Sequence, residues 1–127
     1  MKKVVLDTNF ILTCFKEKID FFREIYFMGY KIIIPKQVLN ELDRIIKSKK
    51  KLHFREQAKL ASKFLENNRK SWIKKNLSEY GKNTDRAIKG FSDKEKDIIV
   101  ATLDKELKRK ISGLKMVIRE KNKLEVV

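Results

Sequence analysis

Short runs of aliphatic residues alternate along this chain with longer segments whose apolar residues recur at helical spacing. Residues 2–7 predict a strand, residues 9–28 have helical character, and residues 30–34 predict a second buried strand. Strands on either side of a helix pair in parallel through a right-handed crossover. Residues 2–34 therefore predict a βαβ unit.

The middle of the chain predicts two helices that form a hairpin. The helix over residues 36–47 has an apolar stripe at the 3.6-residue period, which indicates that it faces the core. A basic connector over residues 47–51 leads to a second amphipathic helix, whose apolar face consists of Phe54, Ala58, Ala61 and Leu65.

Residues 69–83 are polar and basic, and they predict a loop with one helical turn. Thr84 is a suitable cap for a short helix that begins at Asp85. This segment contains the only tryptophan of the chain, Trp72.

The C-terminal part of the chain predicts a second βαβ unit. A strand is expected over residues 98–102, a helix over 105–111 and a strand over 115–118, followed by a short last strand over 124–126. Two βαβ units in succession predict an α/β fold with a central, mainly parallel sheet.

The composition fits one soluble domain over residues 1–127 with a nucleic acid as its partner. A chain of 127 residues with 42% hydrophobic residues can bury one core. No apolar run approaches the roughly 20 residues that span a bilayer, and no signal-peptide pattern follows Met1, so we expect a cytoplasmic protein with no membrane partner. The formal charge of +15 comes from lysines and arginines in every segment, which favours a polyanion such as RNA.

Two residue counts exclude several classes of site. Cys14 is the only cysteine, so a disulfide framework and a thiolate zinc cluster are both excluded. His53 is the only histidine, and its surroundings are those of an ordinary loop residue rather than of a hydrolase triad. Any metal site in this chain must therefore be built from oxygen ligands.

Acidic residues follow two of the predicted strands, at the edge where parallel strands present their carboxyl ends. Asp7 ends the first strand, and Asp104 follows the strand over residues 98–102. Ligands bind beyond this edge in open parallel sheets. If the strands are neighbours, the two carboxylates face one crevice, and their repulsion predicts a bound Mg²⁺ or Mn²⁺. Taken alone, the triplet Asp7-Thr8-Asn9 is more typical of a turn or a helix cap.

Further carboxylates lie near the same crevice. Glu41 and Asp43 flank the apolar stripe of the helix over residues 36–47 on opposite sides, so helical geometry does not choose between them. Asp85 opens a helix, where an acid also complements the helix dipole. On the residues alone, all three stay open as candidates.

Four segments resemble, in order, the four motifs of the PIN-domain ribonucleases: VVLDTNFIL, IIIPKQVLNEL, TDRAI and IIVATLDKEL. The resemblance implies a three-layer α/β/α sandwich and selects Glu41 rather than Asp43. It implies that the catalytic and metal-binding acids are Asp7, Glu41, Asp85 and Asp104. It also implies supporting polar roles for Asn9 and Thr102. Leu103 departs from the small polar residue of many relatives, and a single acid follows Thr84 where some subgroups have two.

The resemblance implies a metal-dependent endoribonuclease that hydrolyses RNA phosphodiester bonds with Mg²⁺ or Mn²⁺. The C-terminal segment is similar to archaeal PIN proteins related to rRNA-processing nucleases, which implies a role in rRNA processing or ribosome biogenesis. The residues that we expect to contact RNA are Lys47, Lys49, Lys50, Lys51, Arg69, Lys70, Lys74 and Lys75, with Trp72 as a candidate for base stacking.

Other interpretations fit the same sequence. One is a toxin-type ribonuclease controlled by an antitoxin, and another is a non-catalytic RNA-binding PIN module in a ribonucleoprotein assembly. A DNA flap nuclease is less favoured because the chain is small. Three protein partners are compatible with the sequence: a second copy of the chain, an antitoxin and a ribosome-assembly protein.

Overall fold

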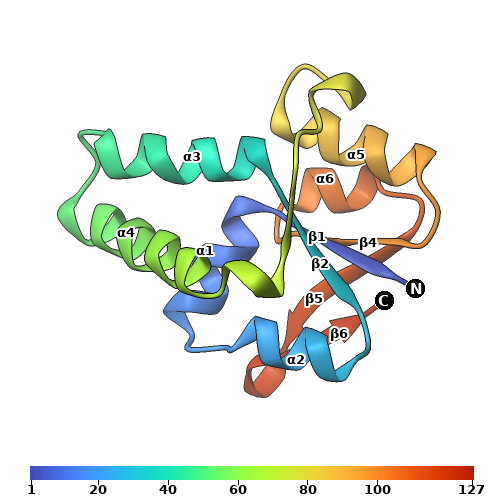
Figure 1. Ribbon diagram of the computed structural model, residues 1–127, viewed down its shortest axis with the longest axis horizontal. Helices are drawn as coiled ribbons and strands as arrows, with labels where there is room; N and C mark the ends of the chain where they lie inside the picture. Colours follow the sequence, from blue (N-terminus) through green and yellow to red (C-terminus); the bar gives the residue numbers. More distant parts are fainter.

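A six-stranded sheet forms the centre of the computed structural model, which describes residues 1–127 (Figure 1). The strand order is β3-β2-β1-β4-β5-β6. All neighbours pair in parallel except β5 and β6, which are antiparallel. The sheet is therefore mainly parallel, as the two βαβ units predict. Its strands are β1 (Lys3–Leu6), β2 (Lys31–Pro35), β3 (Ile73–Lys75), β4 (Ile98–Ala101), β5 (Leu114–Arg119) and β6 (Lys123–Val126).

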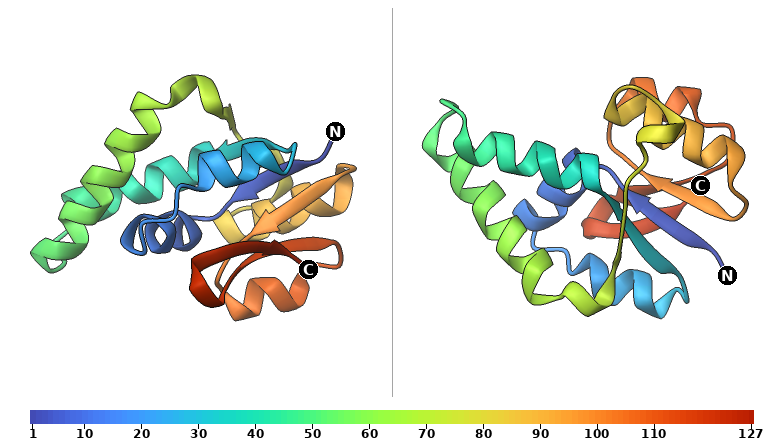
Figure 2. Two further views of the ribbon diagram at one scale, coloured as in Figure 1. Left: turned by 90° about the horizontal axis from the view of Figure 1, so that it is seen from below. Right: turned by 45° about the horizontal axis from the view of Figure 1, so that its top comes forward.

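Helices cover both faces of the sheet (Figure 2), which confirms the three-layer α/β/α sandwich. One face is covered by α1 (Thr8–Lys16), α2 (Phe21–Phe27), α3 (Lys36–Lys47) and α4 (Leu52–Asn67). The other face is covered by α5 (Thr84–Lys94) and α6 (Lys105–Lys110). Short 3₁₀ turns, η1 (Arg69–Ser71), η2 (Ser78–Tyr80) and η3 (Glu120–Asn122), complete the chain. No helix combines the length and the apolar character needed to cross a bilayer.

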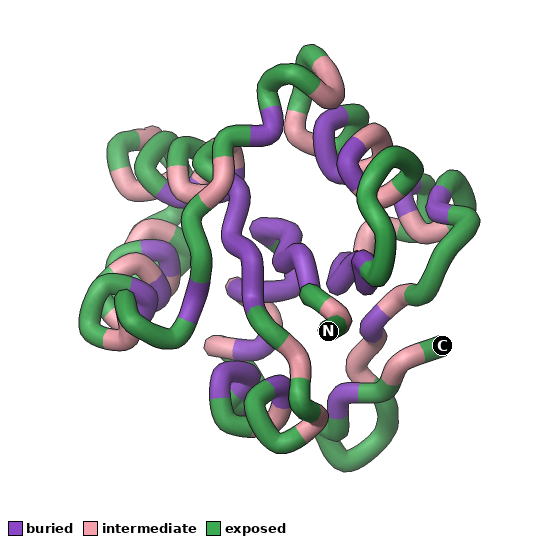
Figure 3. Tube along the Cα trace, turned by 45° about the vertical axis from the view of Figure 1, so that its right-hand side comes forward, coloured by how far each residue is buried: buried purple, intermediate pink, exposed green.

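Successive residues of the strands face two separate cores. Val4 and Leu6 of β1 belong to the larger core under α1 to α4, whereas Val5 belongs to the smaller core under α5 and α6. This alternation follows from the two-residue period of a strand. The buried residues cluster along these strands and the inner sides of the helices (Figure 3). The strands β1 and β4 are buried on both faces, so their ends are well packed. The residues that directly follow these strands are therefore held in position.

Most of the predicted elements are confirmed. The helix predicted over residues 36–47 is α3, and the helical segment over residues 9–28 divides into α1 and α2. The second piece starts at Asp20, whose side chain accepts a hydrogen bond from the Arg23 amide at 3.1 Å. Gly29 ends it with a φ of 83°, a conformation that suits glycine at the end of a helix.

The structure corrects four predictions, and one of them is the loop position of His53, which lies in the first turn of α4. Residues 69–83 are not only loop and turn, because Ile73–Lys75 forms the edge strand β3. The cap of α5 is Asn83 rather than Thr84, since the Asn83 side chain accepts a hydrogen bond from the Arg86 amide at 2.9 Å.

The fourth correction concerns Phe54, which does not join the core. Phe54 is 48% exposed, whereas the other three residues of the predicted apolar face, Ala58, Ala61 and Leu65, are buried. The hairpin of α3 and α4 reaches out beyond the sheet (Figure 1). The first turn of α4, where Phe54 and the exposed His53 lie, therefore has no sheet beneath it.

Candidate active site

Four carboxylates from four separate segments line one cavity of about 480 Å³. Asp7 follows β1, and Asp104 follows β4, which pairs with β1 in parallel. The amide of Asp7 donates to the Ala101 carbonyl at 2.9 Å, so the ladder between the two strands extends to this residue. Helix α3 contributes Glu41, and the first turn of α5 contributes Asp85. The convergence expected at the carboxyl ends of neighbouring strands is present.

Asp7 is held by two hydrogen bonds, and its side chain is only 5% exposed. One carboxylate oxygen, Oδ1, accepts from the Thr8 amide at 2.8 Å, and Oδ2 accepts from the Thr102 hydroxyl at 2.7 Å. The Thr102 hydroxyl also accepts from the Asp104 amide at 3.1 Å. Thr102 therefore couples the two strand ends, and it fixes the orientation of the Asp7 carboxylate.

Two other carboxylates are oriented by local hydrogen bonds. The Thr8 hydroxyl donates to Glu41 Oε1 at 2.8 Å, which joins the start of α1 to α3 across the cavity. Asp104 caps α6, because its Oδ1 accepts from the Glu106 amide at 2.8 Å and from the Leu107 amide at 3.2 Å. Each of these carboxylates keeps its second oxygen available for another partner.

The electric field in the cavity favours a positive charge. Burial, with smaller contributions from the Asp85 and Glu41 charges, raises the pKa of Asp7 from 3.8 to about 6, against the opposing hydrogen bonds from Thr102 and Thr8. Burial and the charges of Asp104 and Glu41 also raise the pKa of Asp85, although the Lys110 ammonium opposes that shift. Charges of one sign raise each other's pKa because each disfavours ionisation of the next.

None of these four acids forms an ion pair, although lysines and arginines outnumber acids in the chain by 32 to 17. All of the ion pairs involve other acids, which are Asp43, Glu56, Asp93, Asp97, Glu106 and Glu125. A set of converging carboxylates that form no ion pairs has the donor chemistry that Mg²⁺ and Mn²⁺ prefer.

The carboxylates of the cavity are spread apart in this structure. No group of three His, Cys, Asp or Glu side chains stands close enough together to hold one ion. Carboxylates that converge repel one another unless a cation offsets their charge. Oxygen ligands of Mg²⁺ lie at roughly 2.0–2.1 Å, so a bound ion would draw the carboxylates together. The donor set therefore fits a divalent cation.

The cavity contains residues that were not among the predicted site residues. Thr8, which the sequence suggests is structural, bonds Glu41, while Arg44 and Ser48 also line the wall. Arg44 and Ser48 lie three and seven positions after Glu41 and share its face of α3, so helical periodicity could have found them. Asn9 lines the cavity, but it makes no hydrogen bond to Asp7.

The structure distinguishes Glu41 from Asp43, the pair that helical geometry leaves open. Glu41 lines the cavity, whereas Asp43 lies outside it and pairs with Lys47 at 2.9 Å. Of the lysines predicted to contact RNA, Lys50 lines the carboxylate cavity, and Lys49 and Lys51 line a groove beside it.

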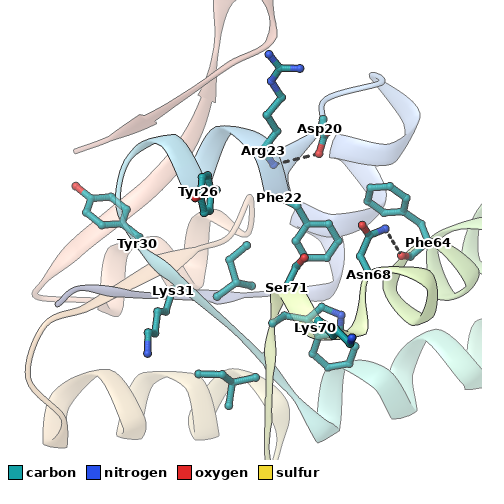
Figure 4. A pocket seen from close by; sticks show the side chains of 13 residues that line it. Asp20, Phe22, Arg23, Tyr26, Tyr30, Lys31, Phe64, Asn68, Lys70 and Ser71 are labelled. Carbon is teal, nitrogen blue, oxygen red and sulfur yellow. Dashed lines mark hydrogen bonds between the residues drawn. The ribbon is translucent and has the colours of Figure 1, made fainter.

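Two of the residues predicted to contact RNA, Lys70 and Trp72, do not line the carboxylate cavity. Lys70 and Trp72 line a different cavity of about 670 Å³, formed with α2 and β2, that contains none of the four acids (Figure 4). Trp72 is 7% exposed, its indole N–H donates to the Leu65 carbonyl at 2.8 Å, and the Arg69 guanidinium lies 4.2 Å from its ring. Stacking of an RNA base on Trp72 is therefore contradicted by its burial, and Trp72 acts as a core residue.

The sequence matches known proteins over most of its length. Residues 4–121 match the PIN like domain family. The chain is also 35% identical, over 133 aligned residues, to "Ribonuclease VapC4" of Methanocaldococcus jannaschii, and the alignment covers 99% of this chain and 97% of that protein.

Solved structures share the fold. The PIN domain endonuclease Utp24 superimposes with a TM-score of 0.78 at 23% identity, covering 98% of this chain and 90% of Utp24. The crystal structure of VapBC2 from Rickettsia felis, bound to a promoter DNA fragment, gives a TM-score of 0.56 at 20% identity. This match covers 87% of this chain and 93% of the matched chain. The family match and the sequence relationship extend over almost the whole chain. The chain therefore belongs to the PIN-domain family of ribonucleases.

Proposed function

We propose that this protein is an endoribonuclease that depends on Mg²⁺ or Mn²⁺. The observation that carries the proposal is the cavity with four carboxylates, none of which forms an ion pair, in a chain of net charge +15. A buried acidic site would repel an RNA phosphate unless cations offset its charge. The basic surface outside the site would in turn attract RNA.

Asp7, Glu41, Asp85 and Asp104 would hold one or two ions, directly or through water. Such ions lower the pKa of a bound water and offset charge on the scissile phosphate. In the proposed reaction a water attacks phosphorus in line and the bond to the 3′ oxygen breaks, which leaves a 3′-hydroxyl and a 5′-phosphate.

The side chains of the cavity have distinct parts in this reaction. Thr102 and Thr8 orient Asp7 and Glu41 through their hydroxyl groups. The Asp85 carboxylate has no hydrogen bond to the protein, and its raised pKa makes it a stronger base, so it is suited to orient the attacking water. Arg44 and Lys50 at the wall of the cavity would hold the phosphate oxygens.

Cleavage assays with a matched pair of variants test the proposal. We expect single-stranded RNA to be cut internally in Mn²⁺ or Mg²⁺, and not in EDTA. Asp7→Asn should abolish cleavage, whereas Asp43→Asn, which removes an acid outside the cavity on the same helix as Glu41, should leave it unchanged. Cleavage by the Asp7 variant, or cleavage in EDTA, would contradict the metal mechanism. Binding of RNA without cleavage in either metal would favour a non-catalytic module.

A second candidate concerns the setting in which the nuclease acts. The sequence relationship to "Ribonuclease VapC4" favours a toxin-type ribonuclease held by an antitoxin over a role in rRNA processing or ribosome biogenesis. Induced expression in a bacterial host separates the two. A toxin-type enzyme should stop growth, and Asp7→Asn should restore it. Normal growth with a protein that cleaves RNA in vitro would exclude this candidate.

A further inference from the structure

A groove of about 860 Å³ adjoins the carboxylate cavity and shares three residues with it, Asn9, Ile45 and Lys50. It lies between α1, the end of α3, the connector of the hairpin and the first turns of α4. A chain that passes through the carboxylate cavity can therefore continue into this groove without leaving the surface.

The rim of the groove is positive and contains no acid. Lys16, Lys49, Lys50 and Lys51 line it, and all four are exposed. None of them forms an ion pair, unlike the neighbouring Lys47. Four unpaired ammonium groups around one groove attract a chain that carries a charge at each repeat, as an RNA backbone does.

The floor of the groove is apolar and fixed. Leu12, Ile45 and Leu103 are partly buried and pack against the larger core. Their exposed surfaces are therefore held in position along the groove. Leu103, the residue that departs from the family pattern, thus has a place in this floor.

Phe54 stands at the edge of this floor with about half of its side chain exposed. Its ring contacts only the His53 ring among the aromatic side chains, with centroids 4.1 Å apart. A flat apolar ring beside unpaired lysines suits an unpaired base, because stacking on an aromatic side chain needs no particular base identity.

We propose that this groove, Lys16, Lys49, Lys50 and Lys51 over a floor of Leu12, Ile45 and Leu103, binds single-stranded RNA and stacks one unpaired base on Phe54. The proposal rests on the proposed nuclease function and deepens it, because it names the residues that hold the RNA beside the carboxylate cavity. A duplex keeps its bases stacked within itself and offers none to Phe54. An acidic protein segment could also use the lysines, but only a nucleic acid offers an unpaired base to stack on Phe54.

Equilibrium binding in EDTA tests the groove without cleavage. Phe54→Ala should weaken binding of a short single-stranded RNA by roughly 5- to 160-fold, the effect of losing one base–aromatic stack, and Phe54→Trp should restore it. Phe27→Ala removes a phenylalanine on α2 that is outside the groove and even more exposed than Phe54, at 72% against 48%, and it should have no effect. Binding of duplex RNA should respond to neither alanine variant.

The lysines have a matched control on the same helix pair. Lys49→Gln should reduce the slope of log affinity against log salt by about 0.7, the value for one phosphate contact of a single strand. Lys63→Gln on α4, which removes the same charge outside the groove, should leave the slope unchanged.

An abasic scan identifies the stacked base directly. RNAs with one abasic position each should include one whose loss of affinity matches that of Phe54→Ala. That RNA should lose nothing further in the variant, because both changes remove the same contact. The proposal would be overturned if the losses from the abasic change and from Phe54→Ala added at every position. It would also be overturned if wild type and Phe54→Ala bound single strands with equal affinity, or if neither bound them.

The outcomes for the groove and for the nuclease are separable. Binding that depends on Phe54 without cleavage in any metal would sustain the groove and remove the proposed function. Cleavage that does not change with Phe54→Ala, with Lys49→Gln or with abasic positions in the RNA would sustain the proposed function and overturn the groove proposal. Displacement of RNA by an acidic peptide whose own binding ignores Phe54→Ala would instead assign the lysines to a protein partner and would also overturn the proposal.

Discussion

Replacing Asp7 by asparagine should stabilise the metal-free protein, even though Asp7 is central to the proposed site. Burial, reinforced by Asp85 and Glu41, raises the pKa of Asp7 from 3.8 to about 6 in the folded state. The unfolded chain releases this proton at the ordinary pKa. The stability that protonated Asp7 gives to the fold is therefore fully present below about pH 4, and it is lost as the pH rises through about 6.

The size of the effect follows from the shift. A difference of about 2 pKa units costs the folded state about 3 kcal/mol at pH 8, and about 1 kcal/mol of this is already lost at pH 4.5. Asparagine keeps the shape and can still accept from the Thr8 amide, but it exchanges the charged hydrogen bond with Thr102 for a neutral one, at a cost of about 1 kcal/mol. The net gain at pH 8 should be about 1–2 kcal/mol.

Urea unfolding in EDTA, followed by circular dichroism, measures this difference. The stability of Asp7→Asn relative to wild type should rise by roughly 2 kcal/mol between pH 4.5 and pH 8. Asp43→Asn, which alters an exposed acid, should show no comparable pH dependence. A variant that is less stable than wild type at pH 8, or a difference that does not change with pH, would refute the reasoning.

Three further predictions concern single contacts. Thr102→Val removes the hydroxyl that Asp7 accepts from, so cleavage of RNA should fall about 10- to 100-fold while far-ultraviolet circular dichroism stays native; unchanged cleavage would contradict the positioning role. Trp72→Phe loses the hydrogen bond to the Leu65 carbonyl and should cost about 1–3 kcal/mol in urea unfolding with no change in RNA affinity, whereas weaker RNA binding would contradict the core role of Trp72. Cys14 is fully buried and burial raises the pKa of its thiol to about 12, so it should react with a thiol reagent only in urea, and rapid labelling of the folded protein would show that α1 is packed differently.

The sheet centre is predictable from the sequence because its strands are buried on both faces. Val4 to Leu6 and Ile98 to Ala101 therefore appear as unbroken apolar runs. Runs this short are typical of buried strands rather than of helices. The edge strand β3 escapes prediction because it is three residues long and almost entirely exposed, with Ile73 on the outside. Residues 73–75 form a strand because they pair with β2. The sequence of β3 itself does not indicate this pairing.

The candidate site shows the same division. Parallel neighbouring strands make the approach of Asp7 and Asp104 predictable, because residues after both strands meet at one edge. The choice of Glu41 over Asp43 needs the rotation of α3 against the sheet, which periodicity alone does not supply.

Phe54 shows how a correct pattern leads to a wrong location. It lies in phase with Ala58, Ala61 and Leu65, so the period predicts a core residue. The period cannot show that the first turn of α4 extends beyond the sheet. This position leaves Phe54 exposed beside the lysines.

Calorimetric titration of Mn²⁺ into the protein tests the central claim, that four carboxylates together bind a divalent cation. The account predicts binding of one or two ions at neutral pH to wild type and to Asp43→Asn. It predicts affinity at least about 10-fold weaker in Asp7→Asn, Glu41→Gln, Asp85→Asn and Asp104→Asn, since each change removes a charged ligand. Mn²⁺ affinity that is the same in wild type and in all four of these variants would contradict the account.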